Sequence, residues 1–209
     1  MKSWSFSSLN NFETCPHRVT FPYKASTNEA AEEGIRVHSV IEAYLNEEND
    51  NNPYPNLPLA DLKAQHPMVE AKWGLDKDWQ PTDYKEAWLK VVVDAAVLSP
   101  TSVTIVDHKT GKREYNQVKH ASQLQLYLCV AQAKWPTMEV YKGELYYTTL
   151  GIIAASKPYT APQLQTLREN WTRRGLAMTN ATEFPAKPSK SNCRFCNFNT
   201  ECDYAFELV

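Results

Sequence analysis

Residues 89–111 read LKVVVDAAVLSPTSVTIVDHKTG, and this stretch decides how the chain folds. Residues 88–98 are rich in valine, which favours a strand, and residues 103–107 form a second apolar run. The segment 99–102 between them is short and polar and contains a proline, which predicts a tight turn. The sequence therefore predicts a strand hairpin, which the Thr110-Gly111 pair ends.

Two aspartates and one lysine mark this hairpin as a candidate site. Asp94 stands inside the first apolar strand, where a charge is unfavourable unless it is paired or bound to a metal. Asp107 ends the second strand, so the hairpin can bring the two carboxylates together, and a divalent cation would relieve their repulsion. Lys109 lies two positions after Asp107, on the same strand face. Two oxygen ligands and an ammonium on one face suit metal-assisted hydrolysis of a phosphodiester.

The Asp-x-Lys pattern is weak by itself, because it occurs three times in the chain. Asp61-x-Lys63 and Asp83-x-Lys85 lie in polar surroundings and are interpreted as surface pairs. The copy at Asp107 could equally be a salt bridge at a strand end. Asp94 on the neighbouring strand favours the metal site over that alternative.

His38 is a further candidate ligand. It lies in a helix predicted over residues 29–48, one turn after Gly34, and a neutral imidazole suits manganese or another transition metal. By itself it could also be an ordinary surface or core histidine. Glu42, on the same helix face, is interpreted as a solvated acid rather than a ligand.

A second helix is predicted over residues 117–134. Gln123 and Tyr127 are four positions apart there, which places an amide and a phenol on one face. Near the hairpin they could bind a phosphate or fix the lysine. The alternative is the polar edge of an ordinary helix.

The five cysteines are informative by position. Cys193, Cys196 and Cys202 lie within ten residues in a chain without a secretory signal, which indicates a metal site rather than disulfides. Cys129 lies in an apolar helical run, where a thiol behaves as a small hydrophobic group, so Cys15 is the predicted fourth ligand. Four thiolates suit either zinc or an iron–sulfur cluster, and their spacing leaves both open. Either would tie the two ends of the chain together.

The remaining pattern predicts an α/β domain with a small mixed sheet covered by helices. It consists of further predicted helices and strands, over residues 7–15, 59–73, 140–150, 152–155 and 161–178. The 209 residues favour a single domain. No apolar run is long enough to span a membrane and no signal peptide is evident, so the default location is cytoplasmic.

The charge is nearly balanced overall, at −2, but it is locally uneven. Residues 29–50 hold seven acids and one base, whereas residues 157–194 hold seven bases and two acids. The basic stretch could follow phosphates while an acidic pocket holds a metal. Two solvated faces are the alternative.

The set Gly34-x3-His38, Asp94, Asp107-x-Lys109-Thr110-Gly111 and Gln123-x3-Tyr127 resembles the PD-(D/E)xK nuclease superfamily, in particular its RecB-type branch. The opening Ser5-x-Ser7-x-Leu9-x2-Phe12-x2-Cys15-Pro16 and the three C-terminal cysteines resemble its iron–sulfur subgroup, which is similar to the CRISPR-associated adaptation exonucleases. This resemblance spans residues 5–202.

The resemblance implies a restriction-endonuclease-like core with assigned residue roles. His38, Asp94 and Asp107 would bind Mg²⁺ or Mn²⁺, together with the backbone carbonyl of His108, and Lys109 would be the catalytic lysine. Gln123 and Tyr127 would support them. A [4Fe–4S] cluster, or a structural Zn²⁺ as the alternative, would be held by Cys15, Cys193, Cys196 and Cys202. Residues 1–20 and 185–209 would form this cluster clasp within one nuclease domain, 1–209.

The function implied by the resemblance is a metal-dependent DNA exonuclease that acts from DNA ends, favours single strands, and serves recombination, repair or phage DNA metabolism. The location would be the host cytoplasm if the protein is phage-encoded. The chain carries no helicase motif, so a helicase or a recombination or adaptation protein is a possible partner. The alternatives are a noncatalytic DNA-binding adaptor subunit and a zinc-clasped structural protein. Intact Asp94, Asp107 and Lys109 argue against the adaptor.

Overall fold

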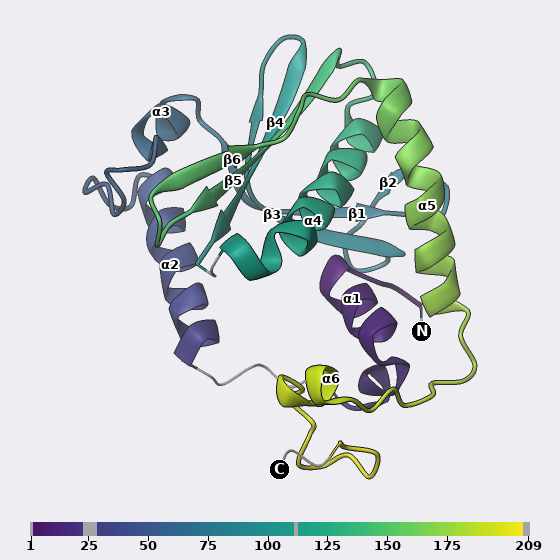
Figure 1. Cartoon of the computed structure of the whole chain (residues 1–209). Coiled ribbons are helices and arrows are strands. Elements are labelled where there is room, and N and C mark those ends of the chain that lie inside the picture. Colours follow the sequence, from purple (N-terminus) through teal and green to yellow (C-terminus); the bar gives the residue numbers. More distant parts are fainter. Residues whose placement is uncertain (1, 23–28, 111–112, 207–209) are drawn as a thin grey trace.

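A computed structural model describes residues 2–22, 29–110 and 113–206, without the side chains of residues 113–115. Gly111 of the predicted motif lies outside these residues, as do both extreme ends of the predicted domain. Figure 1 shows the elements, which in chain order are α1 (Phe6–Thr14), the 3₁₀ helix η1 (Pro16–Thr20), α2 (Glu29–Leu45), α3 (Leu59–Ala64), β1 (Met68–Leu75), β2 (Pro81–Thr82), β3 (Leu89–Leu98), β4 (Ser102–Lys109), α4 (Arg113–Lys134), β5 (Val140–Tyr147), β6 (Ile152–Ala155), α5 (Ala161–Thr179) and α6 (Lys190–Arg194).

The strands form one mixed sheet in the order β2-β1-β3-β4-β5-β6. The predicted hairpin is confirmed, because β3 pairs with β4 in antiparallel fashion. The pair β4–β5 is parallel and the other pairs are antiparallel. Parallel neighbours need a long crossover, and α4 supplies it. The predicted architecture, a mixed sheet flanked by helices, is therefore confirmed.

Helices cover both faces of the sheet. Along β4, Ile105 packs into one hydrophobic core and the next residue, Val106, into the other, as alternation along a strand requires. Helices α1, α4 and α5 close the core around Ile105, whereas α2 and α3 close the core around Val106. Figure 1 shows α4 running across the sheet with α5 beside it.

The prediction of one helix over residues 59–73 is wrong. Helix α3 ends at Ala64, and β1 begins at Met68. Pro67 cannot continue a helix, because it lacks the backbone N–H and its ring clashes with the preceding turn. The following residues pair along β3 from Met68↔Ala96 to Leu75↔Leu89, so long-range pairing decides their conformation.

The other predicted elements are present with shifted ends. Ser5 rather than Ser7 starts the first helix: its Oγ accepts from the Ser8 amide at 3.3 Å, and Ser8 Oγ accepts from the Ser5 amide at 2.8 Å. The second strand of the hairpin continues to Lys109, two residues beyond its predicted end. This extension places both Asp107 and Lys109 within one strand.

Trp4 joins the two ends of the chain. Its backbone pairs with the start of β3: Trp4 N donates to Trp88 O at 2.7 Å, and Lys90 N donates to Trp4 O at 2.9 Å. Its indole stacks on Trp171 of α5 and covers Gly175, where a Cβ atom would lie 2.6 Å from the ring. Close packing thus holds the segment before Cys15 against the helix that leads to the C-terminal cysteines.

No helix among the described residues has the length and apolar character that crossing a membrane requires.

Candidate active site

The hairpin places the two predicted aspartates opposite each other. Ala95 of β3 pairs with Val106 of β4, so Asp94 and Asp107 are the next facing positions in this register. Asp94 is 9% exposed and Asp107 is 1% exposed. Two buried carboxylates at facing positions need nearby positive charge, because burial strongly disfavours an unpaired ion.

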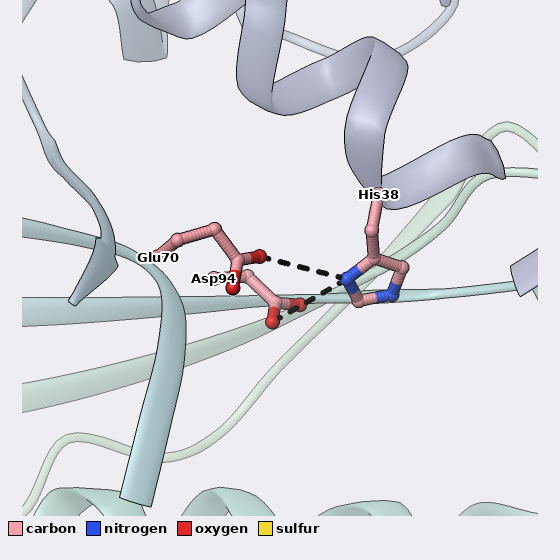
Figure 2. A group of neighbouring side chains, drawn as sticks. All are labelled: His38, Glu70 and Asp94. Atoms are coloured by element: carbon pink, nitrogen blue, oxygen red, sulfur yellow. Dashed lines mark ion pairs between the residues drawn. The ribbon is translucent and has the colours of Figure 1, made fainter. Parts of the chain in front are cut away.

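One part of that charge is the imidazole of His38, which α2 brings to the sheet. Its Nδ1 lies 3.5 Å from Asp94 Oδ1 and 3.9 Å from Glu70 Oε1 (Figure 2). Candidate ligand atoms of His38, Glu70 and Asp94 all lie within 4.8 Å of one another. This spacing and donor set suit one hard or borderline divalent cation.

Glu70 is a site residue that the sequence did not reveal. It belongs to β1, in the segment wrongly predicted as helix. Its neighbours Val69 and Ala71 pair with Ala95 and Val93, so Glu70 falls opposite Asp94. The signal that could have found it is this register, which requires β1 to be recognised as a strand first.

The backbone at Glu70 is strained. Its φ of 46° lies in the left-handed region, which is rare for residues other than glycine and more so within a strand. Strain of this kind persists where the surrounding structure determines the conformation, and it clusters at functional sites. At Glu70 it accompanies a carboxylate directed at His38 (Figure 2).

The charges in this group are strongly coupled. Burial lowers the pKa of His38, but hydrogen bonds to Asp94 and Glu70 and the charges of Asp94 and Asp107 outweigh it and raise that pKa to about 10. Burial alone would raise the pKa of Asp94, yet His38 holds it below its usual value. A positive charge between two carboxylates is therefore favoured, and a divalent cation satisfies the same requirement.

Lys109 and its partners form a second, adjoining network. Lys109 Nζ lies 2.7 Å from Asp107 Oδ2 and donates to Gln123 Oε1 at 3.0 Å. Gln123 Nε2 in turn donates to the Tyr127 hydroxyl at 2.8 Å. Burial raises the pKa of Asp107 to about 6, with Asp94 adding to the rise and Lys109 opposing it. The structure thus brings the predicted Asp107, Lys109, Gln123 and Tyr127 together.

His108 contributes its backbone amide to the site, and Nδ1 of its buried ring lies 3.7 Å from Asp94 Oδ2. Its amide donates to Asp94 Oδ2 at 2.6 Å, which holds that carboxylate in place. Its ring is 2% exposed and packs near His38 and Tyr146. Burial lowers the pKa of this imidazole to about 4, so the ring is neutral. The predicted role of its carbonyl as a metal ligand stays a prediction.

A pocket on the α2 side gives solvent access to the metal-ligand group. Its lining consists of Ala31, Gly34, Ile35, His38, Ser39, Glu42 and Glu70. Gly34 is near Thr110, whose Oγ1 would lie 3.6 Å from an added Cβ. Glu42 is half-buried at this entrance, away from the compact group of three ligands.

The four predicted cysteines line a second pocket. Cys15, Cys193, Cys196 and Cys202 are all half-buried there. Two of the sulfurs accept backbone hydrogen bonds: Lys187 N donates to Cys15 Sγ at 3.3 Å, and Phe206 N donates to Cys193 Sγ at 3.4 Å. Bonds of this kind stabilise thiolates and are typical of metal-bound cysteine. The residues therefore fit a thiolate-bound metal group.

The spacing of these thiols differs from that of a preformed zinc site. Among the described residues, no three cysteine sulfurs lie within 4.8 Å of one another. Four sulfurs around one zinc ion lie about 3.8 Å apart, given a Zn–S distance of about 2.3 Å. The four sulfurs are therefore not all at that spacing.

Cys129 is separate, as predicted. It is fully buried in the core, where its Sγ donates to Leu164 O at 3.7 Å. Burial raises the pKa of this thiol to about 12, which makes it unreactive.

A mixed sheet that brings acids and a lysine to neighbouring strand positions is compatible with metal-assisted hydrolysis of phosphodiesters. The sequence profile of the PD-(D/E)XK nuclease superfamily matches residues 3–203, so the chain belongs to this superfamily. No curated protein matches the sequence.

Two solved structures are similar in fold. An exonuclease candidate from Eubacterium rectale has a TM-score of 0.53 and 11% identity, covering 100% of this chain and 91% of that one. The protein SSO0001 has a TM-score of 0.50 and 15% identity, covering 99% of this chain and 88% of that one. At these identities the likeness concerns the fold alone.

Proposed function

We propose that the protein is a metal-dependent DNA exonuclease that hydrolyses phosphodiester bonds from DNA ends and favours single strands. The observation that carries this proposal is the placement of two groups on facing strands: the His38–Glu70–Asp94 cluster and, opposite Asp94, the Asp107–Lys109 pair. Membership of the nuclease superfamily supports the chemistry, and the description of the Eubacterium rectale structure supports the exonuclease assignment.

The cation would be held by His38, Asp94 and Asp107, with Glu70 as an additional ligand. Mg²⁺ or Mn²⁺ bound there supplies Lewis acidity toward the phosphate and lowers the pKa of bound water. The carboxylates are held in place for this by the chain itself, since the His108 amide fixes Asp94 and Lys109 fixes Asp107.

Lys109 acts as a positioned charge. Its ammonium is held between Asp107 and Gln123, so it needs little reorganisation to stabilise negative charge that develops on the phosphate. Tyr127 determines which end of the Gln123 amide faces Lys109, because the hydroxyl accepts from Nε2 and leaves Oε1 for the ammonium. Gln123 and Tyr127 are therefore positioning residues.

The four cysteines would hold a [4Fe–4S] cluster that joins residues 1–20 to residues 185–209 of a single domain. The shared pocket and the two N–H···S bonds support a thiolate-bound group, and the sulfur spacing, which is not that of a preformed zinc site, supports the choice of the cluster. The basic side chains of Arg18 and Lys187 line the same pocket and would offset the negative charge of such a group.

The nuclease proposal is tested by incubating end-labelled single- and double-stranded DNA with Mg²⁺, Mn²⁺ or a chelator. Wild type should degrade linear DNA in a metal-dependent way, and Lys109→Ala should lose at least about a hundredfold in rate. Lys85→Ala is the matched control, because it alters the exposed Asp83-x-Lys85 copy of the motif and should stay active. A circular single strand should survive an exonuclease.

The alternative hypothesis, a noncatalytic adaptor, predicts the opposite result. It would bind the labelled DNA without cutting it, in either metal and with no difference between wild type and Lys109→Ala. That result from folded protein would overturn the nuclease proposal. Cleavage of the circular strand would overturn the exonuclease assignment alone.

A further inference from the structure

The cysteine-rich segment exposes aromatic side chains that packing does not explain. Phe195, inside the loop between Cys193 and Cys196, is 77% exposed, and the Arg194 guanidinium lies 5.3 Å from its ring centre. Tyr204 and Phe206 are 58% and 47% exposed. Among the described residues, the other large exposed hydrophobic side chains are all aliphatic and scattered over the fold. Single exposed apolar residues are ordinary, but this clustering of aromatic rings favours a binding surface.

Basic side chains connect this segment with the catalytic centre. Of the described residues, Arg18 and Lys187 are basic side chains that line the cysteine pocket, and none of the lining is acidic. Lys119, on the first turns of α4, is exposed. Burial lowers its pKa somewhat, and the charges of Lys109 on one side and Arg18 on the other lower it further. Lys119 lies one helical turn before Gln123 on the same face of α4, and Gln123 Oε1 accepts from Lys109 Nζ at 3.0 Å. This face of α4 therefore places Lys119 beside Lys109, and the charge of Arg18 acts on it from the cysteine pocket.

These linking cations are not neutralised by the protein. Neither Arg18 nor Lys119 makes an ion pair within the described part of the chain. Mutually repelling cations of this kind are stabilised by an external anion, and a phosphate backbone supplies a row of them. Figure 1 shows the α6 segment apart from the sheet, at the same end of the molecule as α1 and the first turn of α2.

We propose that Phe195, Arg18 and Lys119 form a docking path for one DNA strand, with a base stacked on Phe195 and the phosphates following Arg18 and Lys119 to Lys109. The inference rests on the proposed function and names the surface that selects its substrate. A single strand fits because it offers base faces for stacking, whereas a duplex keeps its base faces covered. Arg194 adds a cation beside the ring for the adjoining phosphate.

The path is tested by binding, separately from cleavage. Fluorescence anisotropy of a labelled oligothymidylate is measured in chelator, with wild type, Phe195→Ala and Phe195→Trp. Removing the ring should weaken binding about tenfold, because stacking of one base contributes roughly that much, and tryptophan should restore it. Leu150→Ala is the matched control, since Leu150 is 50% exposed in the turn between β5 and β6 and should bind as wild type.

Salt dependence tests the cations. Loss of one phosphate contact should reduce the slope of log affinity against log salt by about 0.7 for a single strand. Lys119→Gln should show this reduction, whereas Lys142→Gln, an exposed lysine on β5, should not. An unchanged slope for Lys119→Gln would remove it from the path.

Unaltered oligothymidylate binding by Phe195→Ala would overturn the proposal and leave a protein partner as the occupant of this surface. If that variant changes the melting temperature or cysteine reactivity, Phe195→Leu replaces it, keeping apolar bulk without an aromatic face, and should weaken binding similarly. The two proposals fail separately. If the protein binds DNA through Phe195 but never cuts it, only the nuclease proposal is refuted. If the protein is an active nuclease and the loss of Phe195 has no effect, only the docking path is refuted.

Discussion

The catalytic centre and the cysteine pocket are built by opposite means. The residues of the proposed catalytic centre come from α2 and three strands, and strand register together with burial places Asp94 and Asp107. The cysteines come from loops and the five-residue helix α6, are half-exposed, and are held by a few ring contacts such as Phe21 on Phe198. The comparison teaches that strand pairing and burial fix the first site, whereas few contacts within the chain hold the second.

The largest effect should come from removing one thiol. Cys202→Ala should lose iron and sulfide and lower the free energy of unfolding by several kcal/mol, because binding to a site absent from the unfolded chain is folding energy. Metal and sulfide analysis with denaturant unfolding measures both. Cys129→Ala should keep its iron; if Cys129→Ala lost the iron and Cys15→Ala kept it, the assigned fourth ligand would be wrong.

Gly175→Ala should have the second largest effect on stability. Its Cβ would clash with the Trp4 indole that holds the N-terminal arm against α5, so the free energy of unfolding should fall by about 1–3 kcal/mol. Gly34→Ala, in the open interior of α2, should instead raise it by up to about 1 kcal/mol. Urea unfolding of both variants gives the comparison, and equal effects would contradict the packing explanation.

Glu70→Gln should raise the Mg²⁺ concentration needed for half-maximal cleavage by about tenfold, because one negative ligand is lost from the cluster. Titration of activity with metal measures the shift. Glu42→Gln removes an acid from the same entrance without touching the cluster, and it should change this concentration by less than about twofold. A larger shift for Glu42→Gln than for Glu70→Gln would reverse the two assignments.

Tyr127→Phe should have the smallest effect, a fall of about threefold to tenfold in kcat with DNA binding unchanged. It frees the Gln123 amide and loosens Lys109, at the level of one hydrogen bond. Tyr146→Phe removes a hydroxyl that bonds Glu144 instead and should leave kcat unaltered. Weakened DNA binding by Tyr127→Phe would show that the hydroxyl contacts the substrate.

Sequence reasoning succeeded where the signal is local. Asp94 within a valine-rich strand, Asp107 and Lys109 two positions apart, and Gln123 with Tyr127 on one helix face are short-range patterns, and the structure brings these residues together. The cysteine spacing likewise identified four thiols that line one pocket.

It failed where long-range pairing decides the outcome. Glu70 owes its place to the register between β1 and β3, and its left-handed backbone has no signature in a single sequence. The same pairing turned part of a predicted helix into β1, although Pro67 indicated the break. Ser5 and Ser7 are chemically equal caps, and the helix start at Ser5 comes with the reciprocal Ser5–Ser8 hydrogen bonds and with the pairing of Trp4 beside β3.

Cys15 lines the same pocket as the C-terminal cysteines, and this has a consequence for biosynthesis. At translation rates of about 5–20 residues per second, Cys193 is translated roughly ten to forty seconds after Cys15. Throughout that interval the early thiol has no partner, while the strands that place Asp94 and Asp107 are already complete. Any group that needs all four sulfurs is therefore acquired only after the strands that carry Asp94 and Asp107 have been synthesised. Binding of that group would be a separate, later step that a cell could regulate.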